Sequence, residues 1–217
     1  MTTGPTEKTA QRIEATAVEL FFREGYPKTS IREITSALGL TPGALYNHFR
    51  SKEELLYAIV SKTHTAIEQT LEEALLRAGD DPARQLWEVT RALTVFYTQH
   101  QKEAIISKQE YRRLPDPHPA EMLGSERRIR RTVERILERG LRQEAFRLTL
   151  PGGRRADIPI TAKAILDQMI NAGVWFRPEG RLSVDELADQ YAGLVLQLAG
   201  LAPEAAEAAA RPRDRAS

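Results

Sequence analysis

Apolar residues recur at helical spacing along almost the whole chain. In residues 7–24, Ile13, Ala17, Leu20 and Phe21 fall on one face, as the buried side of a helix requires. No run of alternating apolar and polar residues is long enough to build a sheet. Breaks rich in glycine and proline separate the helical segments. The pattern therefore predicts an all-α fold of about nine helices.

Start and stop signals place two short helices after the first one. Ser30 and Glu33 have the spacing of a capping box, in which hydroxyl and carboxylate bind each other's backbone N–H groups. Gly39 permits a turn with positive φ, and Thr41 followed by Pro42 is a typical helix start. Two short capped helices joined by a tight turn predict a helix-turn-helix or an ordinary packed helical hairpin.

A long helix is predicted next. Ser51 and Glu54 repeat the capping-box spacing, and the helical pattern continues to about Ala78. Such a helix would span roughly 40 Å at 1.5 Å per residue, enough to join a small N-terminal domain to a larger one. We expect a first domain at residues 1–52, reaching to about 62 along the linking helix, a second domain at 53–201 and a flexible tail at 202–217.

Composition narrows the class of protein. Hydrophobic residues make up 41% of the chain and charged residues 28%, which is ordinary for a soluble globular protein. The absence of cysteine excludes disulfides, thiolate metal sites and a cysteine nucleophile. No stretch approaches the roughly 18 consecutive apolar residues of a membrane span, and residues 1–10 lack the apolar core of a signal peptide. We therefore expect a cytoplasmic protein without a membrane partner.

Motifs of catalytic sites do not occur in the sequence. The spacing of the four histidines matches neither H-E-x-x-H nor another metal-binding pattern; they are His48, His64, His100 and His118. Neither a G-x-S-x-G motif nor a phosphate-binding P-loop is found. We expect no catalytic residue, no metal site, no cofactor and no enzymatic activity.

Positive charge is concentrated near the two short helices. The net charge of +1 gives no indication of a nucleic-acid partner. Residues 26–52, however, contain four basic residues and one acidic residue, and residues 41–49 contain no acid. DNA affinity depends on the cations that reach phosphates, so a local cluster can serve a nearly neutral chain. In a helix-turn-helix the second helix would enter the major groove, with Leu45 and Phe49 anchoring it to the core.

A family resemblance separates the helix-turn-helix from the hairpin. Residues 15–34 (ATAVELFFREGYPKTSIREI) and 38–56 (LGLTPGALYNHFRSKEELL) resemble the DNA-binding domain of the TetR repressor family. The resemblance implies contacts to the DNA backbone from Thr29, Ser30, Tyr46, His48 and Lys52, and a recognition helix along which Thr41, Pro42, Gly43, Ala44 and Asn47 lie. Of these, Thr41, Gly43, Ala44 and Asn47 are the candidates for reading bases. Because the recognition helix has no arginine, Arg32 or Lys28 is the candidate for a guanine contact.

The same resemblance implies a symmetric pair of chains. The last two helices of this family, here near residues 160–173 and 183–200, pair with their twins in the partner chain. Apolar contact would come from Ile165, Met169, Leu187, Tyr191, Leu194 and Leu198. The alternative is that these stripes form the core of a single chain. Since two operator half-sites require two DNA-binding domains at a fixed spacing, we expect a homodimer.

Short motifs in the second half are similar to a branch of the family that responds to acyl-CoA thioesters. They are residues 111–115, 140–146, 171–183 and 186–192. Large or polar side chains available for a pocket are Trp87, Phe96, Tyr97, Tyr111, Met169, Asn171 and Trp175, and cations for the CoA phosphates are Arg112, Arg113, Arg127, Arg128, Arg130 and Arg131. Both sets have a plainer interpretation, as core aromatics and as a solvated face of ion pairs with Glu126, Glu134 and Glu138.

These patterns together predict a ligand-responsive transcriptional repressor. Residues 1–52 would bind palindromic operator DNA, and residues 53–201 would dimerise and bind an effector that releases the protein from DNA. The first candidate for the effector is an acyl-CoA thioester of lipid or aromatic-acid catabolism. The alternatives are a DNA-binding regulator whose pocket is vestigial and one whose pocket takes another class, such as a hydrophobic drug-like molecule.

Overall fold

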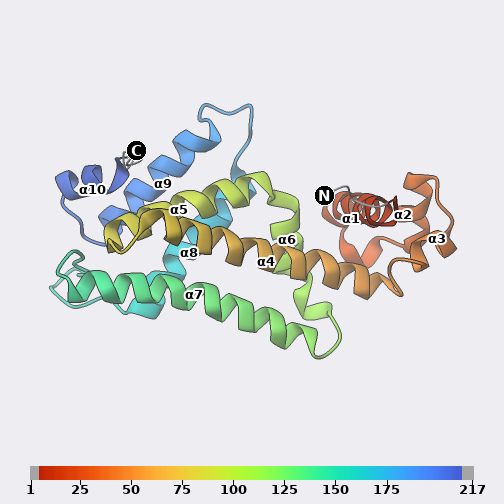
Figure 1. The fold of residues 1–217 in the computed structure, drawn as a ribbon, viewed down its shortest axis with the longest axis horizontal. Coiled ribbons are helices and arrows are strands. Elements are labelled where there is room, and N and C mark those ends of the chain that lie inside the picture. Colours follow the sequence, from red (N-terminus) through yellow and green to blue (C-terminus); the bar gives the residue numbers. More distant parts are fainter. Residues whose placement is uncertain (1–4, 212–217) are drawn as a thin grey trace. The chain divides into compact units, whose positions relative to one another are not determined.

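The computed structural model describes residues 5–211, and these are helical apart from turns and loops (Figure 1). The described residues form ten α-helices and two short 3-10 helices: α1 (Pro5–Glu24), η1 (Tyr26–Lys28), α2 (Ile31–Leu38), α3 (Pro42–Tyr46), α4 (Lys52–Ala78), α5 (Pro82–Gln99), α6 (Gln101–Glu110), η2 (Tyr111–Arg113), α7 (His118–Arg142), α8 (Ile158–Trp175), α9 (Val184–Leu198) and α10 (Pro203–Ala210). An isolated β-bridge joins Thr149 to Arg155, and residues 5–211 contain no longer strand. The predicted all-α fold is confirmed.

The chain divides into two compact units. The first unit joins residues up to 65 to residues 101–124, and the second joins residues 66–100 to the residues from 125 onward. Helices α4 and α7 therefore contribute to both units. The two domains expected from the sequence were consecutive, whereas the units are interleaved along the chain. The functional domain boundaries stay a prediction.

The first unit is built around apolar side chains from several helices. Ile13 of α1, Ile34 of α2, Leu45 of α3 and Leu55 of α4 have no exposed surface. Tyr111 of η2 joins the same core from the later segment. The buried face of α1 is the one that its apolar spacing predicts, so local pattern and tertiary packing agree in this unit.

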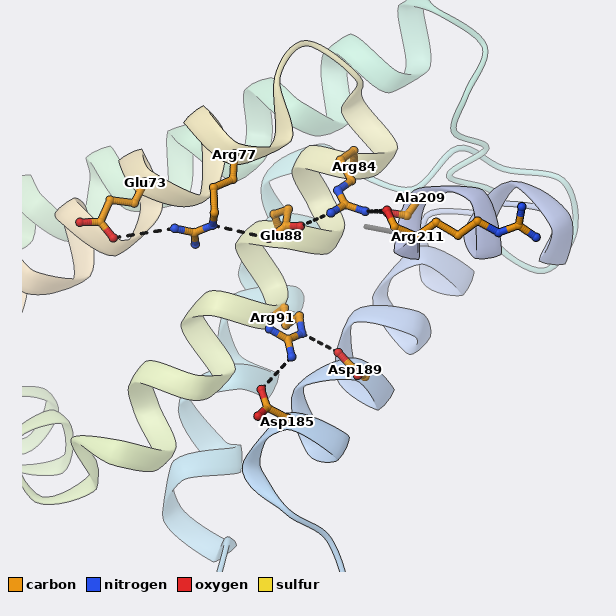
Figure 2. A network of polar contacts seen from close by, with 9 residues as sticks. All are labelled: Glu73, Arg77, Arg84, Glu88, Arg91, Asp185, Asp189, Ala209 and Arg211. Atoms are coloured by element: carbon orange, nitrogen blue, oxygen red, sulfur yellow. Dashed lines mark hydrogen bonds and ion pairs between the residues drawn. The ribbon is translucent and has the colours of Figure 1, made fainter. Parts of the chain in front are cut away.

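The second unit is organised around α5, which packs against α8 and α9. Helix α8 approaches α5 closely at Gly173, where an added Cβ would lie 2.4 Å from the backbone oxygen of Tyr97. Arg91 of α5 holds α9 through two carboxylates, Asp185 at 2.7 Å and Asp189 at 2.6 Å (Figure 2). The close approach at Gly173 and the two ion pairs of Arg91 thus hold α8 and α9 against α5.

Helix α10 corrects the expectation that the chain ends in a flexible tail. Ala209 is buried, and α10 packs on α5 and α9. Arg84 of α5 donates hydrogen bonds to the carbonyl oxygens of Ala209, at 2.7 Å, and of Arg211 (Figure 2). An isolated helix of eight residues is not stable in water, so these distant contacts explain why it forms. Residues 212–217 of the expected tail lie outside the described residues.

Replacing Arg84 with methionine is expected to release α10 and to lower the free energy of unfolding by about 2 kcal/mol. The Arg84 side chain is 12% exposed and also pairs with Glu88 at 2.5 Å, so the variant loses largely buried, charge-assisted hydrogen bonds. Urea unfolding measures the stability, and hydrogen exchange of residues 203–210 measures the release.

The matched control is Arg77→Met, since Arg77 is exposed and lies 3.8 Å from Glu73 and Glu88 (Figure 2). We expect the free energy of unfolding of this control to change by about 0–1 kcal/mol. Unchanged exchange in the Arg84 variant would contradict this role.

Candidate nucleic-acid interface

The turn between α2 and α3 is set by short-range hydrogen bonds. The Ser30 hydroxyl accepts the Glu33 backbone N–H at 3.2 Å, and the Glu33 carboxylate accepts the Ser30 backbone N–H at 2.6 Å. These bonds hold the pKa of the Glu33 carboxyl below its usual value. Gly39 adopts a φ of 66°, and the Leu40 N–H closes the turn on the Thr35 carbonyl at 2.9 Å. The predicted capping box and left-handed glycine are confirmed.

Helix α3 is short and is anchored by one side. The Thr41 hydroxyl accepts the Ala44 N–H at 3.2 Å, as a helix start requires. Leu45 and Phe49 are buried, which confirms the predicted anchors. The other side faces solvent: Thr41, Pro42, Gly43, Tyr46 and Asn47 are exposed, and Ala44 and His48 are half-buried. The structure thus brings the predicted recognition residues together on a segment that contains no acid.

Gly43 has open space around its Cα. A Cβ added there would come no closer than 3.9 Å to any neighbouring atom, the Thr41 Oγ1. Its φ lies outside the left-handed region, so the fold does not demand glycine. Glycine costs about 1 kcal/mol relative to alanine within a helix. The arrangement leaves room for another molecule to approach the backbone of α3.

Exposed cations flank this surface. Lys28 at the end of η1 and Arg32 in the first turn of α2 are both exposed. Neither forms an ion pair with another described residue. Ser30, between them, is also exposed, and its hydroxyl accepts the Glu33 backbone N–H. Lys28 and Arg32 can therefore meet an anionic partner without breaking an ion pair among the described residues.

Thr29 does not have the exposure that a phosphate contact requires. It is 3% exposed, and its hydroxyl donates to the Gly25 carbonyl at 3.0 Å. Its backbone N–H is also used, on the carbonyls of Gly25 and Tyr26. The predicted phosphate contact of Thr29 is corrected to a structural role, because both of its donors are already occupied.

Lys52 also makes contacts within the first unit. Its ammonium Nζ lies 2.9 Å from the Tyr26 carbonyl oxygen and 2.9 Å from that of Thr29. It sits 4.2 Å from the centre of the Tyr26 ring. Burial is the main cause that raises the pKa of the Tyr26 hydroxyl to about 12, so this ring stays neutral.

Residues predicted to contact an effector differ in burial and in the unit to which they belong. Phe96 and Met169 are buried in the second unit, Trp87 is half-buried, and Asn171 and Trp175 are exposed. Tyr111 belongs to the core of the first unit, where its hydroxyl accepts a hydrogen bond from Arg112 at 3.1 Å. The burial of Phe96, Tyr111 and Met169 supports the plainer interpretation, in which they are core side chains.

A surface groove of about 620 Å³ lies in the second unit between α4 and α7. Its charged lining combines Arg128, Arg131 and Arg135 with Glu68, Glu72, Glu134 and Glu138. Arg128 pairs with Glu68 at 2.7 Å, and Arg130 beside the groove pairs with Glu134 at 2.9 Å. Four carboxylates against three guanidinium groups do not favour phosphate, and two arginines of the run, Arg128 and Arg130, are held in ion pairs.

The predicted dimer residues separate into buried and exposed ones. Ile165 and Leu187 are buried within their own chain, where Leu187 packs with Ala172 and Phe176. These two are corrected to core residues. Leu194 and Leu198, by contrast, are 56% and 46% exposed. The helical pattern could not tell a core stripe from an interface stripe.

Further exposed apolar side chains lie on α8. Ile160 and Val174 are exposed and lie on one side of the helix, since 14 residues are close to four turns. The exposed Trp175 ring lies 6.5 Å from the ring of the half-buried Tyr191 of α9. We call Ile160, Val174, Trp175, Leu194 and Leu198 the α8–α9 apolar face. Scattered exposed apolar residues are normal, but a set at helical spacing on two helices that both pack on α5 is typical of an interface.

Within residues 5–211, no helix combines the length and the apolar character needed to cross a bilayer.

Comparisons with known proteins agree on one family. Residues 13–59 match the family described as bacterial regulatory proteins, tetR family, and residues 79–199 match the tetracyclin repressor-like C-terminal domain. The HTH-type transcriptional repressor KstR2 of Mycolicibacterium smegmatis is 24% identical over 195 residues, covering 88% of this chain and 92% of the relative. A solved tetR-family regulatory protein from Rhodococcus RHA1 is 30% identical with a TM-score of 0.78, covering 90% of this chain and 98% of that one. AibR in complex with isovaleryl coenzyme A and operator DNA is 26% identical with a TM-score of 0.73, covering 85% and 96%.

Proposed function

The chain belongs to the TetR family of bacterial transcriptional regulators, and from this premise we propose that it is a repressor that binds operator DNA as a homodimer and leaves it when an effector binds. The observation that carries the proposal is the exposed, acid-free side of α3, flanked by free cations. Such a repressor acts where the chromosome lies, which in a bacterium is the cytoplasm. We assign no catalytic residue, because the relatives are regulators.

The contacts to DNA are proposed according to exposure. Thr41, Gly43, Ala44 and Asn47 read base edges in the major groove, while Pro42 shapes the start of the helix. Ser30, Tyr46 and His48 hold the DNA backbone, and Lys28 and Arg32 supply positive charge toward phosphates or a guanine. All of these side chains are exposed or half-buried, and none has to leave a core position.

Gly43→Ala separates the demands of the fold from those of DNA binding. The variant is expected to raise the free energy of unfolding by about 0.5–1 kcal/mol, because alanine is the better helix former and its Cβ meets no close neighbour. Operator affinity is expected to fall about tenfold, since the methyl group stands where DNA approaches the backbone. Urea unfolding and fluorescence anisotropy measure the two effects. If affinity and stability rise together, α3 does not approach DNA at Gly43.

The α8–α9 apolar face is the proposed dimer interface. Two half-sites lie roughly 34–36 Å apart or a multiple of it, so operator binding requires two DNA-binding units held at that spacing. Leu194 and Leu198 lie one turn apart on α9, and Trp175 lies beside Tyr191. Because Trp175 shares this face, we propose it as an interface residue in place of its predicted effector contact.

An acyl-CoA thioester is the effector class that we propose. Support comes from AibR, whose structure contains isovaleryl coenzyme A and operator DNA. The effector lowers the population of dimers whose DNA-binding units have the spacing of the operator. The size of this shift is set by the difference between the affinities of the effector for dimers with and without that spacing. Helix α4 has residues in both units and is the proposed lever. The second candidate, a regulator whose pocket is filled by its own side chains, is favoured by the burial of Phe96 and Met169.

Fluorescence anisotropy with a labelled duplex from the region upstream of the protein's own gene tests the proposal. We expect binding at low salt and release by isovaleryl-CoA, with free isovalerate and free CoA as controls. Thermal unfolding with each compound gives a second readout, about 2.7 kcal/mol of stabilisation at a hundred times the dissociation constant. If the protein binds DNA but no acyl-CoA releases or stabilises it, the second candidate, a regulator whose pocket is filled by its own side chains, is favoured. Failure to bind DNA would overturn the repressor itself.

A further inference from the structure

One buried threonine of the second unit, Thr90 of α5, lacks the hydrogen bond that the other buried threonines form. Each of the others among the described residues donates its hydroxyl, at 2.8 to 3.0 Å, to the carbonyl four residues earlier; they are Thr29, Thr35, Thr63, Thr94 and Thr161. Thr90 has no exposed surface, and its Oγ1 has no hydrogen-bond partner within residues 5–211. The described part of the chain therefore supplies no partner for this hydroxyl.

A buried hydroxyl without a partner is unfavourable for the fold. Valine has the shape of threonine and would fill the same space without this cost. The neighbours one turn before and one turn after Thr90, Leu86 and Leu93, are apolar and fully buried, so local packing gives no reason for a polar group. A hydroxyl at such a position is explained if another molecule supplies its partner.

A second hydroxyl lies on the same side of α5. Tyr97 follows Thr90 by seven residues, close to two turns, and long helical side chains lean toward the N-terminus of their helix, here toward Thr90. Tyr97 is 5% exposed, and its hydroxyl forms no hydrogen bond with another described residue. Burial raises the pKa of this hydroxyl above its usual value, and the carboxylate of Glu126 adds to the effect. The two hydroxyls are therefore neutral, and their surroundings disfavour negative charge.

Two neutral hydroxyls are suited to an uncharged acceptor. A carbonyl oxygen can accept hydrogen bonds from threonine and tyrosine without bringing charge into the interior. A carboxylate would have to lose its hydration in the same place, and the charge of Glu126 would repel it. An acyl-CoA thioester and its free acid differ at this group, because the thioester carbonyl is neutral and the acid is ionised at neutral pH. The pair of hydroxyls therefore favours the thioester.

We propose that Thr90 and Tyr97 form a polar subsite inside the second unit, where their hydroxyls donate hydrogen bonds to the carbonyl oxygen of the effector. This rests on the proposed function, because it states which atom of the acyl-CoA thioester the second unit recognises. Thr90 has no exposed surface, so the effector reaches it by displacing side chains. Met169 of α8 is the proposed one to move: it is fully buried, lies four residues before Gly173, where α8 meets Tyr97, and has a flexible, unbranched side chain.

Calorimetric titration with isovaleryl-CoA and with its thioether analogue, in which a methylene group replaces the carbonyl, tests the inference. We expect the unchanged protein to bind the thioester about 30-fold more tightly, the effect of two hydrogen bonds. The double variant Thr90→Val/Tyr97→Phe should bind both compounds equally. The matched control is Thr94→Val, because Thr94 is equally buried on α5 but its hydroxyl donates to the Thr90 carbonyl at 2.8 Å. This control should keep the preference for the thioester.

Thermal unfolding without ligand tests the premise that the Thr90 hydroxyl has no partner. Thr90→Val removes a hydroxyl and keeps the shape of the side chain, so its thermal midpoint should rise by about 5 °C. Thr94→Val loses a hydrogen bond, and its midpoint should not rise. A lower midpoint in Thr90→Val would show that the hydroxyl already has a partner, such as a buried water molecule, and would overturn the inference.

The ligand results separate two failures. A preference for the thioester that survives in the double variant would overturn the subsite and leave the effector class intact. Equal binding of the two compounds by the unchanged protein would do the same without any mutation. If the unchanged protein binds neither compound, the acyl-CoA proposal itself is wrong, and the carbonyl contact is overturned with it.

Discussion

The double variant Leu194→Asp/Leu198→Asp is expected to be a monomer in solution and to lose about 100-fold or more in operator affinity. Both leucines are about half exposed on α9 in the single chain, so aspartate there does not disturb its core. In the proposed dimer the same side chains are buried, and two unpaired carboxylates in each chain cost several kcal/mol. A monomer has one DNA-binding unit and cannot occupy both half-sites at once. Its affinity for the operator is therefore lower than that of the dimer.

Analytical ultracentrifugation measures the oligomeric state, and anisotropy measures the affinity. The matched control is Leu76→Asp, because Leu76 is 83% exposed on α4 and lies outside the α8–α9 apolar face. We expect this variant to remain dimeric with unchanged affinity. A double variant that sediments as a dimer would place the interface elsewhere.

Leu45→Ala is expected to lower the stability of the first unit by about 2–5 kcal/mol and to abolish operator binding. Leu45 is fully buried and is one of two anchors of α3, a helix of only five residues. Such a helix cannot persist without tertiary contacts, so the cavity costs packing energy and frees the recognition residues. Hydrogen exchange resolved by residue measures the loss in the first unit. Leu76→Ala is the control and should change stability by about 0.5 kcal/mol or less. Retention of full operator affinity in Leu45→Ala would contradict the anchoring role.

Local signals along the chain predicted much of the helix-turn-helix. The capping box of Ser30 and Glu33, the positive φ of Gly39 and the Thr41 cap all depend on residues within four positions of one another. Ser183 and Glu186 form a capping box of the same spacing at the start of α9. Because these interactions are local, their spacing in the sequence determines them.

Features that depend on distant segments were missed. Residues 101–124 belong to the first unit, and Tyr111 sits in its core, because packing joined segments that the sequence separates. Helix α10 forms where alanine-rich sequence indicated a flexible tail, since Arg84 binds its last carbonyls from more than 120 positions away. No local pattern reports such a contact.

The sequence also did not show which side chains of a helix are exposed. Apolar spacing placed Leu187 and Leu194 in one stripe of α9, yet the structure buries the first and exposes the second. Thr29 resembles a residue that contacts phosphate, but its hydroxyl and its backbone N–H donate to backbone carbonyls of the same unit. A residue's type and position in a motif indicate which bonds it can form, while the fold decides which acceptor is nearer.

In the proposed complex, the exposed side of α3 enters a DNA groove. Equilibrium binding to the upstream duplex by the variant Tyr46→Ala/Asn47→Ala tests it most directly, with Lys108→Ala/Gln109→Ala, on the exposed part of α6, as the matched control. We predict that the α3 variant stays folded and loses about 100-fold in affinity, and that the α6 variant stays within about threefold of the unchanged protein. Equal affinities for the two variants would contradict the account.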